Sequence, residues 1–341
     1  MADKFDPPAA IIFGCAGKSL TPDEYQLFKN IRPAGFILFA RNIENADQVR
    51  ALIRELRGVS IGAEALIMID QEGGRVQRLI PPIWRSYPAL KEFGDRAVID
   101  LEEASKCLEL NYRLIAKELV SLGINVNCAP VLDIFMEASN NVIGNRAISN
   151  NPKIISILGK SVCRGLASSG VIPVIKHIPG HGRADLDSHA ELPRVTTDLN
   201  TLRHTDFVPF KALRSSPAAM TAHILYAAID RENPASVSRQ VVLKTIRKDI
   251  GFDGLLFSDD VCMGALSGTS SARIEAVLGA GCDIALHCSG EYLDMASVSK
   301  NCPVMSSESV RRMVSALAVT RNTDDLNLDA AKERVNQFLA G

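Results

Sequence analysis

One segment, from Lys176 to His189, concentrates more groups that could do chemistry than any other part of the chain. It reads KHIPGHGRADLDSH and holds three of the six histidines within 14 residues. Its glycines and proline favour a loop after a strand over a helix. Asp187 precedes His189 by two positions, and a carboxylate so close to an imidazole could orient the ring and raise its proton affinity. We interpret this pair as an acid–base pair, in preference to a solvated loop with incidental histidines.

A metal site is a second interpretation of the same segment, because His and Asp are common metal ligands. His177 and His181 are separated by Pro179 and Gly180, which disfavours ligation from one face of a helix. The eight cysteines include no Cys-x-x-Cys pair and mostly lie in apolar runs. We therefore expect scattered buried thiols, no metal and no cofactor.

Two adjacent carboxylates, Asp259 and Asp260, follow the apolar run LLFS. Neighbouring residues of a strand point to opposite faces, so these two should not share a role. One could face a cleft as a nucleophile. The other could orient loops or cap the next helix, which is also the structural alternative for either residue alone.

A third carboxylate, Asp70, opens the motif DQEGGRVQR, which ends at Arg78. The two glycines of this motif predict a tight turn. Carboxylate acceptors and guanidinium donors suit the paired hydroxyls of a sugar. A salt-bridged turn is the alternative interpretation, and it is more credible for Arg75 than for Asp70.

Short apolar runs that alternate with amphipathic segments must position these side chains. Eight runs are predicted as strands: Ala10–Gly14, Gly35–Ala40, Ala65–Asp70, Asn125–Ala129, Val171–Lys176, Ala218–His223, Gly254–Asp259 and Cys282–His287. Near-continuous apolar strands separated by helices predict a parallel sheet covered on both faces. Eight such units favour an α/β fold of the (β/α)8 TIM barrel type over an open sheet.

The helical segments carry recognisable end signals. Asn45 is a candidate N-cap, and Gly123 and Gly281 are candidate C-terminal ends. The chain has no Pro/Ser/Gly linker, charge block or low-complexity tract. We therefore expect one catalytic domain over residues 1–341, with terminal helices at about 306–341 packed on the barrel.

Several predicted strands end in an ionisable group. These residues are Asp70, Lys176, His223, Asp259 and His287. In a barrel of parallel strands such ends share one face, where the active sites of this fold lie. A single polar residue at a strand end means little, but a convergent set predicts an active site.

Composition excludes several classes of function. The apolar fraction of 47% and the charged fraction of 23% are ordinary for a globular protein. A net charge of −1 leaves no basic excess for nucleic acid. No apolar run approaches the roughly 20 residues of a membrane span, and the N-terminus lacks the pattern of a signal peptide. We expect a cytoplasmic monomer without nucleic-acid or membrane partners.

Six motifs in order make the chain resemble the bacterial β-N-acetylglucosaminidases (β-hexosaminidases) of glycoside hydrolase family 3, of the single-domain peptidoglycan-recycling type. The resemblance runs from about residue 11 to residue 339. The motifs are GFILF at Gly35–Phe39, DQEGGRVQR at Asp70–Arg78, NCAPVLD at Asn127–Asp133, KHIPGHG at Lys176–Gly182, DSH at Asp187–His189 and FSDD at Phe257–Asp260. The chain departs from the pattern at Val261-Cys262, where relatives often carry Leu-Ser. We expect that difference to change packing beside the nucleophile and not the chemistry.

The resemblance implies a role for each matching position. Asp259 corresponds to the nucleophile, His189 to an unusual acid/base, and Asp187 to the residue that orients it. The positions that correspond to sugar-binding residues are Asp70, Arg78, Arg146, Lys176 and His177. The implied reaction removes terminal β-linked N-acetylglucosamine with retention, through a covalent glycosyl-enzyme.

The implied substrate is N-acetylglucosaminyl-1,6-anhydro-N-acetylmuramic acid, with or without a peptide. Three alternatives to a metal-independent hydrolase stay open. A phosphorylase on the same fold would use phosphate as acceptor, since a neutral imidazole base repels an anion less than a carboxylate does. A metal-dependent hydrolase would use His177, His181 and His189, and a non-catalytic sugar-binding or regulatory barrel would have no turnover. The hydrolase is the favoured interpretation.

Overall fold

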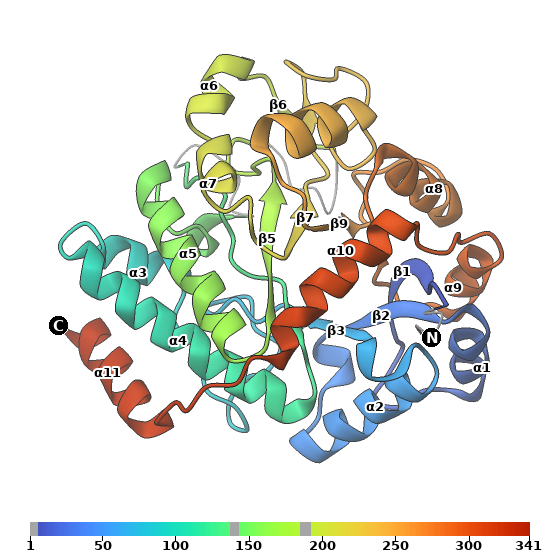
Figure 1. Ribbon diagram of the computed structural model, residues 1–341, viewed down its shortest axis with the longest axis horizontal. Helices are drawn as coiled ribbons and strands as arrows, with labels where there is room; N and C mark the ends of the chain where they lie inside the picture. Colours follow the sequence, from blue (N-terminus) through green and yellow to red (C-terminus); the bar gives the residue numbers. More distant parts are fainter. Residues whose placement is uncertain (1–5, 137–142, 185–191) are drawn as a thin grey trace.

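The computed structural model describes residues 6–136, 143–184 and 192–341, and its centre is a closed barrel of parallel strands (Figure 1). Eight strands pair around the barrel in the order β1-β10-β9-β7-β5-β4-β3-β2. Their bounds are β1 Ala9–Gly14, β2 Pro33–Leu38, β3 Leu66–Ile69, β4 Val126–Asn127, β5 Ile172–Ile178, β7 Ala218–Thr221, β9 Leu255–Asp260 and β10 Ile284–His287. The pairing of β1 with both β2 and β10 closes the barrel.

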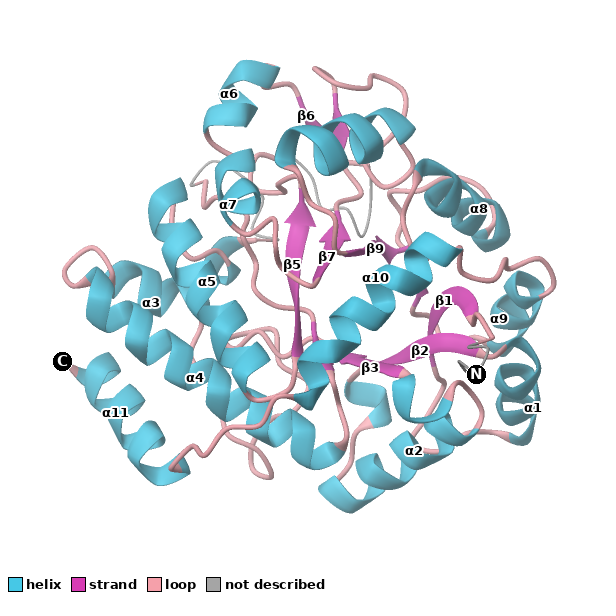
Figure 2. Ribbon diagram, in the orientation of Figure 1, coloured by secondary structure: helices cyan, strands magenta, loops and turns pink. Residues whose placement is uncertain are grey.

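Helices surround these strands, as Figure 2 shows in cyan around magenta. The α-helices are α1 Pro22–Ile31, α2 Ala46–Gly58, α3 Leu90–Arg96, α4 Leu101–Leu122, α5 Pro152–Ser168, α6 Leu199–His204, α7 Phe207–Ala212, α8 Ser270–Ala280, α9 Tyr292–Ser299, α10 Ser307–Leu317 and α11 Leu328–Ala340. The 3-10 helices are η1 Ala40–Asn42, η2 Gly62–Glu64, η3 Gly144–Arg146 and η5 Ala318–Arg321, and η4 Val241–Ile250 is a π-helix. A small sheet of β6 Arg194–Val195 and β8 Leu225–Tyr226 was not expected from the sequence.

All eight predicted strands are confirmed, and the barrel with them. The largest difference is β4, which is only two residues long. The side-chain amide of Asn125 bonds the N–H of Ile67 at 2.7 Å and the C=O of Ala65 at 3.1 Å. The amide of Asn127 likewise bonds the N–H and C=O of Gln71, both at 3.0 Å. These side-chain bonds add to the backbone bonds that Asn125 and Cys128 donate to Ile67 and Ile69 of β3, and apolar periodicity does not reveal them.

The predicted helix ends are also confirmed. Asn45 Oδ1 accepts from the N–H of Gln48 at the start of α2. Gly123 and Gly281 end α4 and α8 with φ of 93° and 112°, a left-handed conformation that glycine adopts without steric cost. Each helix therefore begins or ends at a residue whose chemistry suits that end.

The interior of the barrel is closed at one end by α10. Met313 and Ala316 of α10 pack into the same buried cluster as the inward side chains of the strands, including Ile12 and Phe257. The N–H of Ala10 bonds Pro303 O at 2.9 Å, just before this helix. Because Ala10 lies at the start of β1, α10 covers the N-terminal ends of the strands and leaves their C-terminal ends for a site.

The described part of the chain contains no helix long and apolar enough to cross a lipid bilayer. All eight cysteines lie in that part and carry free thiols, and five of them are buried. The expectation of scattered, unpaired thiols is therefore confirmed.

Candidate active site

A cavity of about 290 Å³ opens at the C-terminal ends of the barrel strands. β2, β3, β5, β7, β9 and β10 all contribute to its wall directly or through the loop that follows. Ionisable, aromatic and sulfur-containing side chains line it together: Phe39, Asp70, Arg75, Arg78, Arg146, Lys176, His177, His181, Met220, Asp259, Asp260, Met263 and Cys288. Parallel strands bring their carboxyl ends to one face, so the location follows from the fold.

A network of ion pairs forms one side of this cavity. Lys176 Nζ lies 2.9 Å from Asp70 Oδ1 and 2.6 Å from Glu72 Oε1. Arg78 Nη2 binds the other oxygen of Asp70 at 3.1 Å. Arg146 Nε and Nη2 bind the two oxygens of Glu72 at 2.9 and 2.8 Å. Among the described residues, three cations therefore share two carboxylates, and this set carries one net positive charge.

Burial would raise the pKa of the two carboxyls, but the neighbouring cations outweigh it. Lys176 and Arg78 hold the pKa of Asp70 well below its ordinary value. Arg146 and Lys176 lower the pKa of Glu72 to about 2. Burial would lower the pKa of Lys176, yet Asp70 and Glu72 raise it above the ordinary value. The network is therefore fully ionised at neutral pH. Removing any one of its charges would leave another desolvated charge without a partner.

The turn after Asp70 confirms the prediction from its two glycines. Gly73 and Gly74 have φ of 92° and 58°. A Cβ on Gly73 would lie 2.3 Å from Pro88 O, and one on Gly74 would lie 2.7 Å from the Cβ of Ala89. Only glycine fits both the backbone conformation and the space, and this turn returns Arg78 to the carboxylate of Asp70.

A second buried group centres on Asp133, which lies between β4 and η3. Its Oδ2 lies 2.7 Å from His177 Nδ1. Its Oδ1 accepts from the backbone N–H groups of His177 and His181 at 3.2 and 2.6 Å. The two imidazoles stand edge to face with centroids 5.5 Å apart. Asp133 thus holds both histidines of the KHIPGHG motif in place from outside that motif.

The charge states of this group differ. Burial would raise the pKa of Asp133, but His177 lowers it. Burial, aided by the nearby His177, lowers the pKa of His181 to about 4. At neutral pH the carboxyl of Asp133 is ionised and the imidazole of His181 is neutral.

The adjacent aspartates at the end of β9 both border the cavity but have different partners. Asp260 Oδ1 accepts from the N–H groups of Cys262 and Cys288 at 3.0 and 3.1 Å, and so ties two loops together. The side chain of Asp259 accepts only the N–H of Asp260, at 2.8 Å, among the hydrogen bonds of the described residues. Burial would raise the pKa of Asp259, but His223, followed by His177 and Lys176, lowers it. Asp259 is therefore an ionised carboxylate with a face toward the cavity.

Six of the predicted site residues come together around this cavity: Asp70, Arg78, Arg146, Lys176, His177 and Asp259. The predicted acid–base pair, Asp187 and His189, lies outside the described residues. Of the polar strand ends, His223 and His287 do not line the cavity. His223 instead bonds Ser236 Oγ and the backbone C=O of Asp260, and His287 bonds Asp294. The prediction that all five strand-end residues converge on one site is therefore wrong for His223 and His287.

Sequence reasoning missed Glu72 and Asp133. Both lie inside motifs that were recognised, DQEGGRVQR and NCAPVLD, but their partners are 74 and 44 residues away in the chain. The only available signal was a carboxylate within a Gly- or Pro-rich segment after a strand. Trp84 and Tyr87, two aromatic residues that follow the DQEGGRVQR motif and could stack on a sugar ring, do not line the cavity, and Tyr87 is buried.

The arrangement suits a small polyhydroxylated ligand. Carboxylate acceptors and guanidinium and ammonium donors line one wall, and each can reorganise its hydrogen bonds toward hydroxyl groups. Asp259 places an ionised carboxylate in the same cavity. Such a pairing can hold a ring and present a nucleophile to it.

The sequence matches a known family over most of its length. Residues 18–335 match the glycosyl hydrolase family 3 N terminal domain. The chain is 36% identical over 347 residues to a β-hexosaminidase from Bordetella pertussis, covering 98% of this chain and 97% of the relative. It is 37% identical over 282 residues to a β-hexosaminidase from Pseudomonas aeruginosa, covering 82% of each chain.

Solved structures with the same architecture agree. NagZ from Neisseria gonorrhoeae, in complex with N-trifluoroacetyl-D-glucosamine, superposes with a TM-score of 0.87 at 30% identity, over 98% of this chain and 99% of that one. A glycoside hydrolase family 3 β-N-acetylglucosaminidase from a Paenibacillus species gives a TM-score of 0.83 at 29% identity, over 96% of this chain and 66% of that one.

Proposed function

Because this chain belongs to glycosyl hydrolase family 3 and is a β-N-acetylhexosaminidase, we propose that it removes terminal β-linked N-acetylglucosamine from peptidoglycan fragments with retention of configuration. The observation that carries the mechanism is the place and state of Asp259, a partly exposed carboxylate that lines the cavity at the end of β9 and whose pKa is lowered by His223, His177 and Lys176 against the effect of desolvation. An ionised carboxylate beside a wall of hydroxyl-binding groups is what a retaining mechanism requires.

In the proposed reaction, the Asp259 carboxylate attacks the anomeric carbon of the sugar. The bond from that carbon to the aglycone oxygen breaks, and a covalent glycosyl-enzyme forms. Water then attacks the same carbon, Asp259 leaves as the carboxylate, and the sugar is released with its original β configuration. Two inversions at one carbon give net retention.

The proton that the aglycone oxygen needs is assigned to His189, which the family resemblance identifies as the acid/base. His189 in its charged form would protonate the leaving oxygen, and in its neutral form it would accept a proton from the incoming water. Asp187 would orient the ring and stabilise its charged form. Both residues lie outside the described part of the chain, so these roles rest on the motif DSH alone.

The ion-pair network is the proposed sugar-binding wall. Asp70 offers acceptors, while Arg78, Arg146 and Lys176 offer donors within one connected set of ion pairs. His177, fixed by Asp133 through Nδ1, keeps Nε2 for a sugar hydroxyl. Because their ion pairs hold these groups in place before the ligand arrives, binding orients the anomeric carbon of the sugar toward Asp259.

The proposed substrate is N-acetylglucosamine linked to 1,6-anhydro-N-acetylmuramic acid, with or without a peptide. The relative from Neisseria gonorrhoeae was solved with an N-acylated glucosamine, which supports the sugar and leaves the aglycone to experiment. A cytoplasmic location and a monomeric state belong to the same proposal, and cell fractionation and sedimentation velocity test them.

The test is release of chromophore from an aryl N-acetyl-β-glucosaminide by wild type, Asp259→Asn and His189→Ala. The activity of Asp259→Asn should fall by more than the roughly 10²–10⁴-fold that loss of a general acid–base costs. His189→Ala should remain measurable on an aryl leaving group, which needs little protonation. Proton NMR of the first-formed product should show the β anomer.

Two added conditions separate the alternatives. Turnover that survives EDTA and yields free sugar in phosphate buffer supports the hydrolase. Sugar 1-phosphate as the main product would replace it with a phosphorylase. Full activity in Asp259→Asn would falsify the nucleophile assignment.

A further inference from the structure

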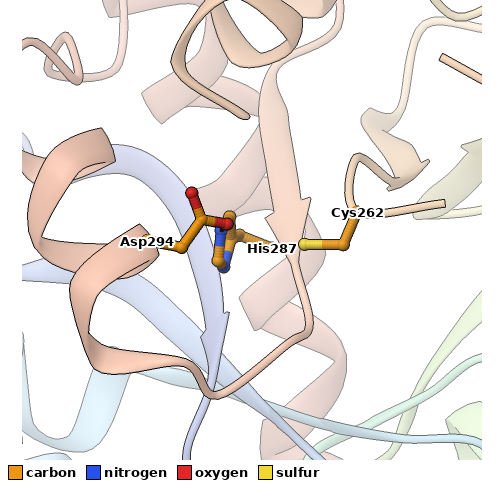
Figure 3. Close-up of side chains that lie close together, drawn as sticks. All are labelled: Cys262, His287 and Asp294. Atoms are coloured by element: carbon orange, nitrogen blue, oxygen red, sulfur yellow. Dashed lines mark hydrogen bonds and ion pairs between the residues drawn. The ribbon is translucent and has the colours of Figure 1, made fainter. Parts of the chain in front are cut away.

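Three potential metal ligands from three different elements meet beside the cavity. Cys262 follows β9, His287 ends β10, and Asp294 lies in the first turn of α9. One ligand atom from each lies within 4.8 Å of the ligand atoms of the other two. Figure 3 shows the imidazole between the carboxylate of Asp294 and the thiol of Cys262, whose sulfur points toward the ring.

The surroundings of His287 fix the direction in which its ring points. Its side chain is fully buried, with Nε2 bound to Asp294 Oδ2 at 2.8 Å. Its Nδ1 is also buried and has no hydrogen-bond partner among the described residues. The two ring nitrogens point away from each other, so a cation held by Asp294 would take the place of the proton on Nε2, and Nδ1 would stay available to water. Asp294 also accepts from Ser270 Oγ at 2.8 Å, so its carboxylate is held toward the ring.

We propose that Cys262, His287 and Asp294 form a binding site for a thiophilic divalent cation of the Zn²⁺ class. A thiolate, an imidazole and a carboxylate are the three ligand types that Zn²⁺ takes in proteins. Ligands at 2.0–2.3 Å in tetrahedral geometry lie roughly 3.5 Å from one another. The observed separations bracket that value, from the 2.8 Å hydrogen bond between His287 Nε2 and Asp294 Oδ2 to at most 4.8 Å. Cys262 and Asp294 are both partly exposed, so their side chains have room to adjust.

This proposal departs from the expectation, drawn from the sequence, that the chain holds no metal. That expectation was based on the lack of Cys-x-x-Cys pairs and on the spacing of His177, His181 and His189. The ligands proposed here are separated by 25 and 7 positions in the sequence, and a search for closely spaced motifs does not bring them together.

The site is separate from the sugar cavity but linked to it. None of the three residues lines the cavity. The N–H groups of Cys262 and Cys288, the latter next to His287, both bond Asp260 Oδ1. Met263, adjacent to Cys262, does line the cavity. A cation would therefore fasten the segment after β9 to β10 and α9 without entering the reaction, and this role does not depend on the proposed function.

The test uses purified full-length protein stripped of metal by dialysis. Zn²⁺ affinity is measured by competition with a chromophoric chelator, and Co²⁺ is added separately as an optical probe. Wild type should bind one Zn²⁺, show thiolate-to-Co²⁺ charge-transfer absorption in the near ultraviolet, and gain thermal stability with Zn²⁺, because ligands that bind only the folded state raise Tm.

Cys262→Ser and Asp294→Asn should weaken Zn²⁺ binding by more than the roughly 10–100-fold that loss of an outer-shell partner causes. Cys262→Ser should also lose the charge-transfer band. Cys302→Ser, at another partly exposed free thiol, is the matched control and should behave as wild type. Circular dichroism checks that each variant folds. Unchanged Zn²⁺ affinity in Cys262→Ser, or the absence of a thiolate band in wild type, would overturn the proposal.

Discussion

The Nδ1 atom of His177 lies 2.7 Å from Oδ2 of Asp133, and the carboxylate is fully buried. Because the same carboxylate also accepts the backbone N–H groups of His177 and His181, one side chain sets both the position and the tautomer of the ring. A proton on Nδ1 leaves Nε2 as the acceptor for a ligand. Asp133 is a positioning residue, since it acts through His177.

Asp133→Asn should lower kcat/KM by about 10²-fold, because its amide would face Nδ1 and turn or re-tautomerise the ring. The fold should persist, since the amide oxygen can still accept the backbone N–H groups. Steady-state kinetics on an aryl N-acetyl-β-glucosaminide, with kcat and KM separated across pH, checks this. Asp249→Asn, at a surface pair with Arg203 and Lys211, is the control. A variant of Asp133 with the pH profile of wild type would contradict the positioning role.

Glu72→Gln should destabilise the protein by about 3 kcal/mol or more, because removing one partner from a buried ion network leaves charge uncompensated. The folded pKa of Glu72, about 2, lies below its ordinary value of 4.5. Its contribution is therefore complete above about pH 4.5 and is lost as the pH falls toward 2. Urea unfolding at several pH values measures both effects. Glu102→Gln, at an exposed pair with Lys106, should show neither.

His181 should make stability depend on pH in a different window. Its folded pKa of about 4 lies below the ordinary 6.5, so between these values the unfolded chain binds more protons. Stability from this residue is complete above about pH 6.5 and is lost as the pH falls toward 4. His181→Gln should flatten that part of the stability curve, and His204→Gln on the exposed α6 should not. An NMR titration that finds His181 charged at pH 6 would contradict the assignment.

Gly182→Ala should cost roughly 1–3 kcal/mol and reduce activity, because its Cβ would lie 2.0 Å from Ile134 O and the backbone beside His181 must shift. Gly279→Ala is the matched control. It lies inside α8 with nothing within 4 Å of an added Cβ, so it should raise stability by about 0.5–1 kcal/mol. Thermal unfolding and the aryl glycoside assay test both variants. If Gly182→Ala and Gly279→Ala were equally stable, the proposed clash between an added Cβ at position 182 and Ile134 O would be wrong.

Much of the architecture could be predicted from local patterns. Runs of apolar residues identified all eight strands, and Asn45, Gly123 and Gly281 identified helix ends. These features depend on neighbours a few positions apart, where side-chain periodicity and capping act. The short β4 could not be predicted, because the amides of Asn125 and Asn127 bond backbone groups at β3, far away in the sequence.

The sequence by itself determined a parallel barrel and the strand ends that carry Asp70, Lys176 and Asp259 to one mouth. Only the tertiary structure decided which polar strand ends face the cavity: His223 and His287 turn to other partners. It also decided the ionisation of Glu72, Asp133 and His181, and brought Cys262 to His287 and Asp294. The physical reason is that periodicity is a local property of the chain, whereas burial and charge interactions depend on distance in space, across tens of residues of sequence.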